Sequence, residues 1–437
     1  MRPWYSPRNS TNIGRIILQT PTSKSPYCSL ENNKKSLYPE KRATLYVHWP
    51  YCAKLCPYCN FNKYVRDNVD HTRMADCLVK ETNTLIEISG IEEIKSVYFG
   101  GGTPSLAKPA TISAIINCVR NNVTMATDAE VTLEVNPTTT EIGKLKEFKH
   151  AGVNRISIGV QSMYNEDLRF LGRQHTVEDA VRCVMDAKTL FPGDVSIDIM
   201  FGRPNQTVLQ WEKELQQILG ISDNHISLYQ LTVERGTPLY TWVQEGKVVL
   251  PDDNVMADLF EMAVEELERK GFIQYEISNF AKDGKEGRHN KAYWEGEQYI
   301  GVGPGAHGRF IPRSLGRYER EERVQTSEPN SWMVEVERQG HGTRLARPQS
   351  LLTQLEELIV MGLRTKDGIS NETWQRRCRS YSLKDVFYNK ESVKQHIEDG
   401  FMICDHRGMK VSKKGLAILN SIVADLLNIL SERWSGG

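Results

Sequence analysis

Three cysteines stand at a spacing that suits a metal or iron–sulfur centre. They are Cys52, Cys56 and Cys59, in the stretch CAKLCPYCNF at residues 52–61. A tetrahedral zinc site needs four ligands, and His48 could supply the fourth. A 4Fe-4S cluster held by only three cysteines instead leaves one iron open to bind another molecule. The spacing alone leaves both kinds of site open, and Phe61 stands where a fourth cysteine could have followed.

The composition limits the classes of protein to consider. The 437 residues are 39% hydrophobic and 25% charged, which is ordinary for a soluble globular protein. Lys plus Arg and Asp plus Glu both number 55, so net charge gives no reason to expect a nucleic-acid partner. No apolar run approaches the ~18 residues of a transmembrane helix, which leaves only peripheral membrane contact open. Nine cysteines with a single cluster fit a reducing compartment better than a secreted disulfide framework.

The first residues differ in composition from the rest of the chain. Residues 1–30 contain four basic residues and five serines, and the first acidic residue is Glu31. This basic, serine-rich and acid-free composition is typical of a mitochondrial transit peptide. The alternative is a disordered tail, because several prolines limit any amphipathic helix. We predict a mitochondrial location, with residues 1–40 outside the fold.

The rest of the chain must position the cysteines, and its first part alternates strand and helix patterns. Apolar residues recur at helical spacing in Ile112–Val119 and in Val177–Val184. Strands separated by amphipathic helices predict βαβ units and a parallel sheet. We therefore predict an α/β fold built on a partial (β/α)6 barrel, with a doubly wound sheet as the alternative. The strand patterns are at residues 44–49, 96–100, 131–136, 155–161, 195–201 and 225–231.

The predicted strands alternate apolar and polar residues, unlike the continuous apolar strands of most parallel sheets. If the apolar set faces the helices, the polar set converges inside the barrel. Isolated buried carboxylates are costly, so such an interior predicts a polar or charged ligand. The alternative is that these residues lie at strand ends in water. The residues concerned are Tyr46, His48, Glu134, Gln161 and Asp198.

Cysteines spaced C-x3-C-x2-C directly after the first strand resemble the radical S-adenosylmethionine (SAM) superfamily. From about Leu45 to the C-terminus, the chain resembles the HemN/HemW group of that superfamily. The resemblance implies that Cys52, Cys56 and Cys59 hold a 4Fe-4S cluster whose open iron binds the amino and carboxylate groups of SAM. The motifs that carry it are GGGTP (100–104), LEVNP (133–137), GVQS (159–162), LGRQH (171–175) and SIDIMFGRP (196–204).

The resemblance also implies which residues contact SAM. Cluster-bound SAM would contact Tyr46, Gly101 and Glu134. Glycines permit close backbone approach, and a carboxylate can accept a charge-assisted hydrogen bond from the SAM amino group. A second SAM site is described for this group, and it would comprise Tyr58, Gly102, Thr103, Gln161, Arg173 and Asp198.

Phe61 distinguishes the two branches of the group. Coproporphyrinogen dehydrogenases carry C-x3-C-x2-C-x-C, and Phe61 replaces the last cysteine. The stretches HNKAYW (289–294) and GVGPGAHG (301–308) resemble the HemW branch, whose members are regarded as haem chaperones. The resemblance thus implies a protein that binds haem and a SAM-ligated cluster, and delivers haem to haem-dependent proteins. The alternative is a radical SAM enzyme similar to oxygen-independent coproporphyrinogen III dehydrogenase. The radical SAM residues are retained, but the replacement of the fourth motif cysteine by Phe61 argues against coproporphyrinogen dehydrogenase activity.

The HN-x-x-YW motif is the proposed haem-binding element of the HemW branch. His289 could offer an axial imidazole, with Asn290 beside it, while Tyr293 and Trp294 could cover a porphyrin face. Alternatively, the aromatic residues fill a small core. The motif follows the sixth predicted strand, so we expect it outside the run of six βα units. His307 is a second candidate ligand.

The domain organisation follows from these patterns. We predict a radical SAM barrel with its HNKAYW extension over residues 41–311, and a polar linker over 312–344. Residues 345–430 would form a smaller winged-helix-like C-terminal domain of the HemN type. It would begin with a helix at residue 351 and contain a hairpin and a helix within 401–427. The balanced charge does not support a DNA-binding role, so we expect a lid or a partner surface.

Overall fold

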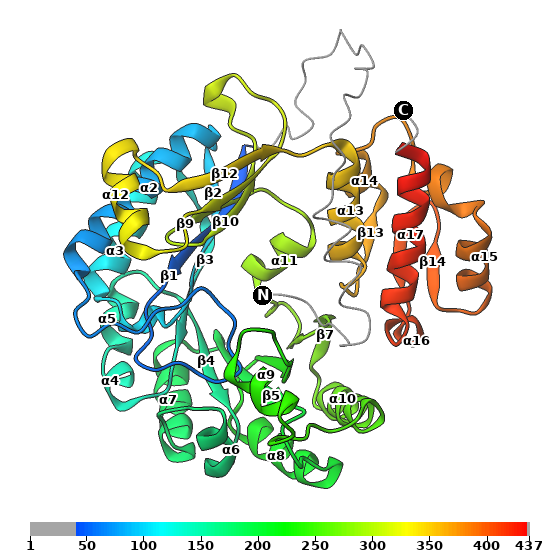
Figure 1. Cartoon of the computed structure of the whole chain (residues 1–437). Coiled ribbons are helices and arrows are strands. Elements are labelled where there is room, and N and C mark those ends of the chain that lie inside the picture. The colour runs from blue at the N-terminus through cyan, green and yellow to red at the C-terminus, as the bar shows by residue number, and fades with distance from the viewer. Residues whose placement is uncertain (1–40, 435–437) are drawn as a thin grey trace. The chain divides into compact units, whose positions relative to one another are not determined.

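The computed structural model describes residues 41–434, and Figure 1 shows the whole chain. The described residues divide into two compact units, 41–349 and 350–434. The predicted transit peptide, residues 1–40, lies outside the described residues. Within residues 41–434, no helix combines the length and the apolar character needed to cross a membrane.

The first unit is built on six neighbouring parallel strands that follow one another in chain order. Helices lie on the outer face of this curved sheet (Figure 1). This arrangement confirms the predicted α/β fold with a partial (β/α)6 barrel. The strands are β1 (Arg42–Trp49), β2 (Glu93–Gly101), β3 (Thr124–Val135), β4 (Arg155–Gln161), β5 (Val195–Phe201) and β6 (His225–Gln230).

The helices between the strands bury the apolar faces that the sequence pattern predicts. In α3 these are Ile112, Ile115, Ile116 and Val119, and all four are buried. Two of the longer helices, α7 and α8, begin with capping boxes, which satisfy the first backbone N–H groups. The helices are α2 (His71–Ser89), α3 (Pro109–Asn122), α4 (Thr139–Ile142), α5 (Leu145–His150), α6 (Asn165–Phe170), α7 (Val177–Leu190), α8 (Val208–Ile221), α9 (Pro238–Gln244) and α10 (Asp253–Arg269), with a short 3-10 turn η1 at Pro104–Leu106.

Further strands extend both edges of the barrel sheet to twelve strands. At one edge, β9 (Tyr299–Val302) pairs in parallel with β1 and is followed by β10 (His307–Phe310), β11 (Glu321–Gln325) and β12 (Thr343–Pro348). At the other edge, β8 (Asn279–Ala281) and β7 (Ile273–Glu276) follow β6. The sheet is therefore mixed at its edges and parallel at its centre.

The prediction of a linker over residues 312–344 is wrong. This stretch contains the 3-10 turn η2 (Arg313–Leu315), β11, α12 (Pro329–Gln339) and the start of β12. Despite its polar composition, the segment contains the fully buried Trp332. The Trp332 indole N–H donates to the Glu81 carboxylate of α2 at 3.0 Å. The Gly303 and Gly342 backbone N–H groups donate to the same carboxylate at 2.7 Å. These contacts fix the segment to the barrel.

Helix α11 (Arg288–Trp294) lies on the inner side of the curved sheet, opposite the outer helices (Figure 1). It packs against β2. The chain therefore places the HN-x-x-YW motif inside the barrel opening. We call residues 285–294, which include α11 and the turn before it, the plug segment.

The second unit is a helical unit with one small sheet. Its strands pair in the order β13-β15-β14, all antiparallel. Helix α13 packs against α17, and Leu355 and Leu358 of α13 and Ile422 and Leu426 of α17 are buried. The hairpin and helix predicted within 401–427 are confirmed. The elements are α13 (Leu351–Gly362), β13 (Ile369–Ser370), α14 (Asn371–Gln375), the short π-helix η3 (Lys384–Tyr388), α15 (Glu391–Glu398), β14 (Met402–Cys404), β15 (Gly408–Val411), α16 (Lys413–Leu416) and α17 (Leu419–Trp434).

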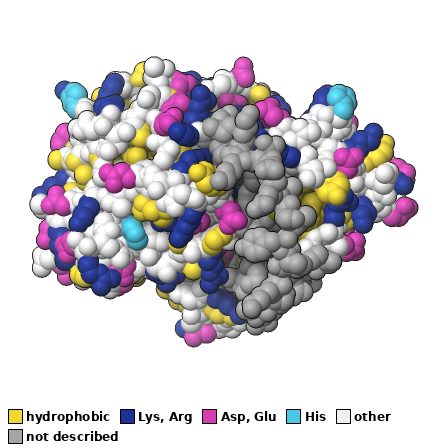
Figure 2. Space-filling view, turned by 90° about the horizontal axis from the view of Figure 1, so that it is seen from above, with side chains coloured by type: hydrophobic (Ala, Val, Ile, Leu, Met, Phe, Trp, Pro, Cys, Tyr) yellow, Lys and Arg dark blue, Asp and Glu magenta, His cyan; other side chains and the backbone are white. Residues whose placement is uncertain are grey.

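The surface charges are mixed in sign. On the face seen in Figure 2, Lys and Arg side chains of the described residues are interspersed with Asp and Glu. This distribution agrees with the equal totals of basic and acidic residues in the sequence.

Candidate functional site

The cysteine loop follows the carboxyl end of β1. Its path is fixed by backbone hydrogen bonds, since Cys52 N–H donates to Tyr64 O at 2.9 Å and Tyr64 N–H donates to Pro50 O at 2.8 Å. Cys59 N–H donates to Cys56 O at 3.2 Å, which forms a tight turn between the second and third cysteines. All three thiols are partly exposed. The loop thus presents three thiols at the end of the first barrel strand.

Groups from two other loops, one after β2 and one between α6 and α7, contact these thiols. The Thr103 hydroxyl donates to Cys52 Sγ at 3.4 Å, and Arg173 Nη1 lies 3.9 Å from Cys56 Sγ. Burial raises the pKa of the Cys52 thiol to about 11, and the nearby Cys59 and Cys56 add to this effect. Cys56 and Cys59 therefore form part of the electrostatic environment of the Cys52 thiol.

The donor set fits a three-cysteine cluster better than a zinc ion. Both ring nitrogens of His48, the alternative fourth zinc ligand, are engaged: Nδ1 lies 3.0 Å from the Tyr46 hydroxyl and Nε2 lies 2.8 Å from Asn62 O. Among residues 41–434, no three His, Cys, Asp or Glu side chains are arranged around one metal position. A 4Fe-4S cluster takes each thiolate on a different iron, so the sulfurs need not converge on one point.

The glycine run at the end of β2 lies against the cysteine loop. Gly101 has φ +110°, and a Cβ there would lie 2.5 Å from the His48 ring. A Cβ on Gly102 would lie 2.8 Å from Tyr51 O. The backbone N–H groups of Gly102 and Thr103 donate to Trp49 O and Tyr51 O at 2.7 and 2.9 Å. These glycines are needed because two chain segments approach closely at the site.

Polar side chains converge inside the barrel, as the alternation along the strands predicts. The Tyr98 hydroxyl donates to Glu134 Oε1 at 2.8 Å, and Gly101 N–H donates to Glu134 Oε2 at 3.2 Å. Ser157 donates to both carboxylate oxygens of Asp198, at 3.0 and 3.1 Å. Tyr46 lies in the same interior, its ring stacked 6.2 Å from that of Tyr98. Tyr46, Tyr98, Glu134 and Asp198 all keep partial exposure.

The two interior carboxylates are hard to ionise together. Burial raises the pKa of Glu134 to about 7, and the negative charge of Asp198 adds to the shift. Burial likewise raises the pKa of Asp198 to about 6. Two such groups in one interior favour a ligand that brings N–H donors or positive charge.

Two further residues of the predicted SAM sites, Arg173 and Gln161, have unusual local features. Arg173 Nη2 donates to Gly159 O at 3.0 Å, whereas its Nε is buried with no hydrogen-bond partner among the described residues. Gln161, at the end of β4, has φ +70°, a strained conformation for a residue other than glycine. An unpartnered guanidinium N–H and backbone strain are features that recur at ligand sites.

The structure contradicts the expected placement of the HN-x-x-YW motif. His289 is 2% exposed, and its Nδ1 and Nε2 lie 2.9 Å from the Ser96 hydroxyl and 2.8 Å from the Tyr293 hydroxyl. Burial lowers the pKa of His289 to about 3, so the imidazole is neutral. Asn290 and Trp294 are also buried. The motif lies inside the barrel, not outside the βα units, because α11 turns back onto β2.

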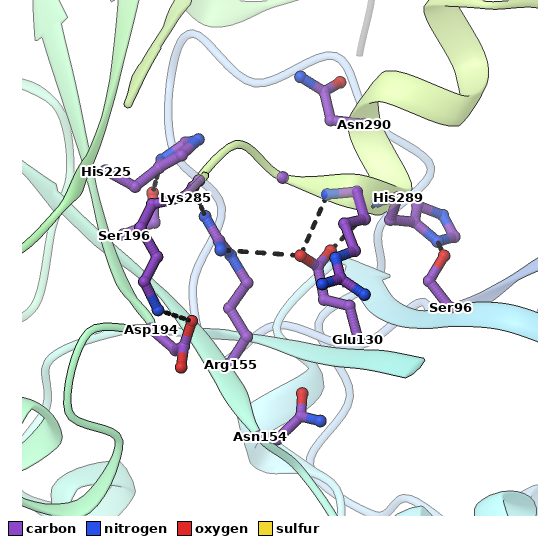
Figure 3. A network of polar contacts seen from close by, with 12 residues as sticks. Ser96, Glu130, Asn154, Arg155, Asp194, Ser196, His225, Lys285, His289 and Asn290 are labelled. Carbon is purple, nitrogen blue, oxygen red and sulfur yellow. Dashed lines mark hydrogen bonds and ion pairs between the residues drawn. The ribbon is translucent and has the colours of Figure 1, made fainter. Parts of the chain in front are cut away.

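A polar network anchors the start of α11 (Figure 3). The Glu130 carboxylate of β3 accepts the backbone N–H groups of Arg288 and His289, both at 3.1 Å. Arg155 of β4 lies 3.6 Å from that carboxylate and donates to Lys285 O at 3.2 Å. Glu130 thus caps the helix, and Arg155 balances its buried charge.

Sequence reasoning missed Tyr98, Glu130 and Arg155. Tyr98 could have been found by alternation, because it lies two residues from Ser96 on the same face of β2. Glu130 lies within β3 and Arg155 begins β4, and no local pattern predicts their partners more than a hundred residues away.

Comparison with known proteins gives consistent similarities. A family model described as the Radical SAM superfamily matches residues 46–218. The chain is 49% identical over 394 residues to "Radical S-adenosyl methionine domain-containing protein 1, mitochondrial" of Bos taurus, covering 90% of this chain and 89% of that protein. It is 32% identical over 386 residues to "Heme chaperone HemW" of Bacillus subtilis, covering 88% of this chain and 99% of that protein.

A solved structure shares the fold. Coproporphyrinogen III oxidase (HemN) from Escherichia coli superposes with a TM-score of 0.71 at 21% identity, covering 90% of this chain and 91% of that one. Vertebrate relatives at 47–49% identity are named as mitochondrial, and the present chain is mitochondrial as well.

Proposed function

Since the chain belongs to the radical SAM superfamily, in the group of mitochondrial radical SAM domain-containing protein 1 and HemW, we propose that it binds a 4Fe-4S cluster and SAM. Cys52, Cys56 and Cys59 would hold three irons and leave the fourth for SAM. Such a cluster supplies one electron for reductive cleavage of SAM. The observation that carries this proposal is the loop of three thiols beside an interior that contains Glu134.

The chain's own residues would bind and orient SAM. Glu134 would accept hydrogen bonds from the SAM amino group, with Tyr46 and Gly101 beside it. For a second SAM, the unpartnered Arg173 Nε would bind the carboxylate. The remaining residues of that second site would be Tyr58, Gly102, Thr103, Gln161 and Asp198.

We further propose that the protein binds haem and passes it to haem-dependent proteins. Phe61 stands at the position of the fourth motif cysteine, is 49% exposed, and cannot ligate iron. Two relatives are named heme chaperone HemW. The match to the first spans 88% of this chain, and the match to the second spans 61% of this chain and 70% of that protein. The second candidate function, a radical SAM enzyme similar to coproporphyrinogen III dehydrogenase, is kept because all of the proposed cluster and SAM residues are present in the chain.

The haem contacts proposed from the resemblance are His289, Asn290, Tyr293 and Trp294. An axial imidazole binds iron through one ring nitrogen, so His289 could ligate haem iron only by releasing either Ser96 or Tyr293. Because His289 is buried, the residues around it would also have to rearrange. His307, at the start of β10, is exposed and is the alternative axial ligand.

Incubation of the reconstituted protein with SAM, a reductant and coproporphyrinogen III separates the two functions. The haem-chaperone proposal predicts no protoporphyrinogen above the level without protein. Stoichiometric or multiple turnover would establish the dehydrogenase instead.

Haem titration of three variants then locates the haem. The proposal predicts near-normal haem affinity when all three motif cysteines are changed to Ala, and weaker affinity in His289→Ala or His307→Ala. Loss of haem in the triple-cysteine variant alone would assign haem to a thiolate and contradict separate sites.

A further inference from the structure

We propose that Tyr98 and His289 are positioning residues for SAM, through which the plug segment sets the orientation of the Glu134 carboxylate. This inference rests on the proposed role of Glu134 in binding the SAM amino group. It gives the HN-x-x-YW motif a role in the SAM site that is separate from any haem contact.

A continuous set of contacts joins α11 to Glu134. The His289 ring lies 5.1 Å from the Tyr98 ring, centroid to centroid, and the Tyr98 hydroxyl donates to Glu134 at 2.8 Å. The Tyr98 ring also stacks against the ring of Tyr46, another proposed SAM contact. The phenol that orients Glu134 is therefore in contact with an imidazole from α11 and a phenol from β1.

The His289 ring is itself fixed at both nitrogens and at its backbone. Ser96 of β2 and Tyr293 of α11 engage the two ring nitrogens, and Glu130 of β3 accepts the backbone N–H. Tyr293 packs edge-to-face on Tyr299 of β9, the neighbour of β1, at 4.7 Å. A ring held in this way restricts the rotamer of Tyr98, and a single rotamer keeps the carboxylate oriented before SAM arrives.

The Tyr98 hydroxyl remains a donor at every relevant pH. Burial, and then the charge of Glu134, hold the pKa of Tyr98 well above its usual value. The titratable groups that face Glu134 are Tyr46 of β1, Tyr98 of β2, Asp198 of β5 and Tyr229 of β6. Of these, the Tyr98 hydroxyl bonds to Glu134, which favours the ionised carboxylate and opposes the effect of burial.

The test measures the SAM dissociation constant of reconstituted full-length protein between pH 5.5 and 9. In the wild type, affinity should rise with pH through about 7, as Glu134 ionises. Tyr98→Phe removes the donor, so the midpoint should move to higher pH and affinity at pH 7 should fall roughly 10-fold or more. His289→Gln should shift the midpoint in the same direction, because Tyr98 loses the ring that holds it.

The double variant should bind SAM no more weakly than Tyr98→Phe alone, since both changes act through one hydroxyl. Ser96→Ala, which removes only the Nδ1 partner of His289, provides a milder variant if His289→Gln folds poorly. Tyr275→Phe is the matched control. The Tyr275 hydroxyl bonds to Gly287 and Asn290 of the plug segment and to His225, but not to Glu134, so its removal should leave the midpoint unchanged.

An unchanged midpoint in both His289→Gln and Ser96→Ala, or additive losses in the double variant, would overturn the inference. Glu134→Gln separates this failure from that of the proposed SAM site. If Glu134→Gln weakens SAM binding and removes its pH dependence while the plug variants do not, only the inference fails. If Glu134→Gln binds SAM normally, the proposed role of Glu134 fails, and the inference fails with it.

Discussion

At the scale of single residues, the site is a set of groups whose types follow from spacing and alternation. The three thiols could be identified from their separation, and the interior positions of Tyr46, Glu134 and Asp198 follow from the two-residue period of the strands. The environment of His289 could not be predicted, because its partners Ser96 and Glu130 lie more than 150 residues earlier in the chain. A motif specifies residue types, but the burial of those residues depends on which distant segments of the chain pack against them.

The cysteines and Phe61 should respond differently to substitution. Cys59→Ala should lose most of the iron bound after anaerobic reconstitution, because three thiolates are the minimum for a cluster with one open iron. Phe61→Ala should keep the wild-type iron content and change the free energy of unfolding by less than about 0.5 kcal/mol, because Phe61 is half exposed. Iron and sulfide analysis and denaturant unfolding give the two quantities. Loss of iron in Phe61→Ala would mean that the aromatic ring shields the cluster.

At the scale of elements, two segments late in the chain complete a site that the first strand begins. The plug segment packs against Tyr98 from inside the barrel. The glycine-rich stretch 301–308 supports the cysteine loop. Asn62, three residues after Cys59, donates to Pro304 O and Ser327 O, both at 2.9 Å.

The six parallel strands were predictable because each carries its own apolar pattern. The edge strands β11 and β12 were not, because their polar sequence resembles a linker and the buried Trp332 lies in α12 between them.

The glycine-rich stretch should tolerate no side chain at Gly303. This residue has φ +98°, and a Cβ would lie 2.4 Å from His48 O. Gly303→Ala should lower the free energy of unfolding by about 2–4 kcal/mol through strain and displacement of β1. Gly236→Ala is the control, because Gly236 has φ +85° with nothing within 4 Å, and only the backbone cost of about 1 kcal/mol should appear. Equal losses in the two variants would contradict a close approach at Gly303.

The anchor of α11 should depend on its buried ion pair. Arg155 and Glu130 are 7% and 9% exposed, so Arg155→Leu leaves a buried carboxylate without its counter-charge. The free energy of unfolding should fall by about 3–5 kcal/mol. Arg182→Leu, which breaks the exposed pair with Asp179, should cost less than about 1 kcal/mol. Denaturant unfolding of both variants checks this, and similar costs would mean that Arg155 does not balance Glu130.

At the scale of the whole molecule, the fold and the compartment were predictable, and the domain boundaries were only partly so. The compact unit ends at residue 349, not at 311, because the strands beyond β10 join the barrel sheet. Composition placed the protein in mitochondria, and the naming of its relatives agrees. The function of residues 1–40 as a transit peptide stays a prediction.

Removal of residues 1–40 should separate import from folding. A chain that starts at Lys41 keeps all of β1, so it should bind the same iron and SAM as the full chain. It should remain in the cytosol, because the acid-free basic segment is the proposed import signal. Cell fractionation of tagged full-length and shortened chains gives the result. Normal import of the shortened chain would place the signal elsewhere.

The central claim is that three thiols and a polar barrel interior form one site for a cluster and SAM. Its most direct test is the electron paramagnetic resonance spectrum of the anaerobically reconstituted, reduced full chain, with and without SAM. The account predicts about four irons and four sulfides per chain and a cluster signal that SAM alters, because SAM binds the open iron. Stoichiometric zinc without sulfide, or a cluster signal that SAM leaves unchanged, would contradict it.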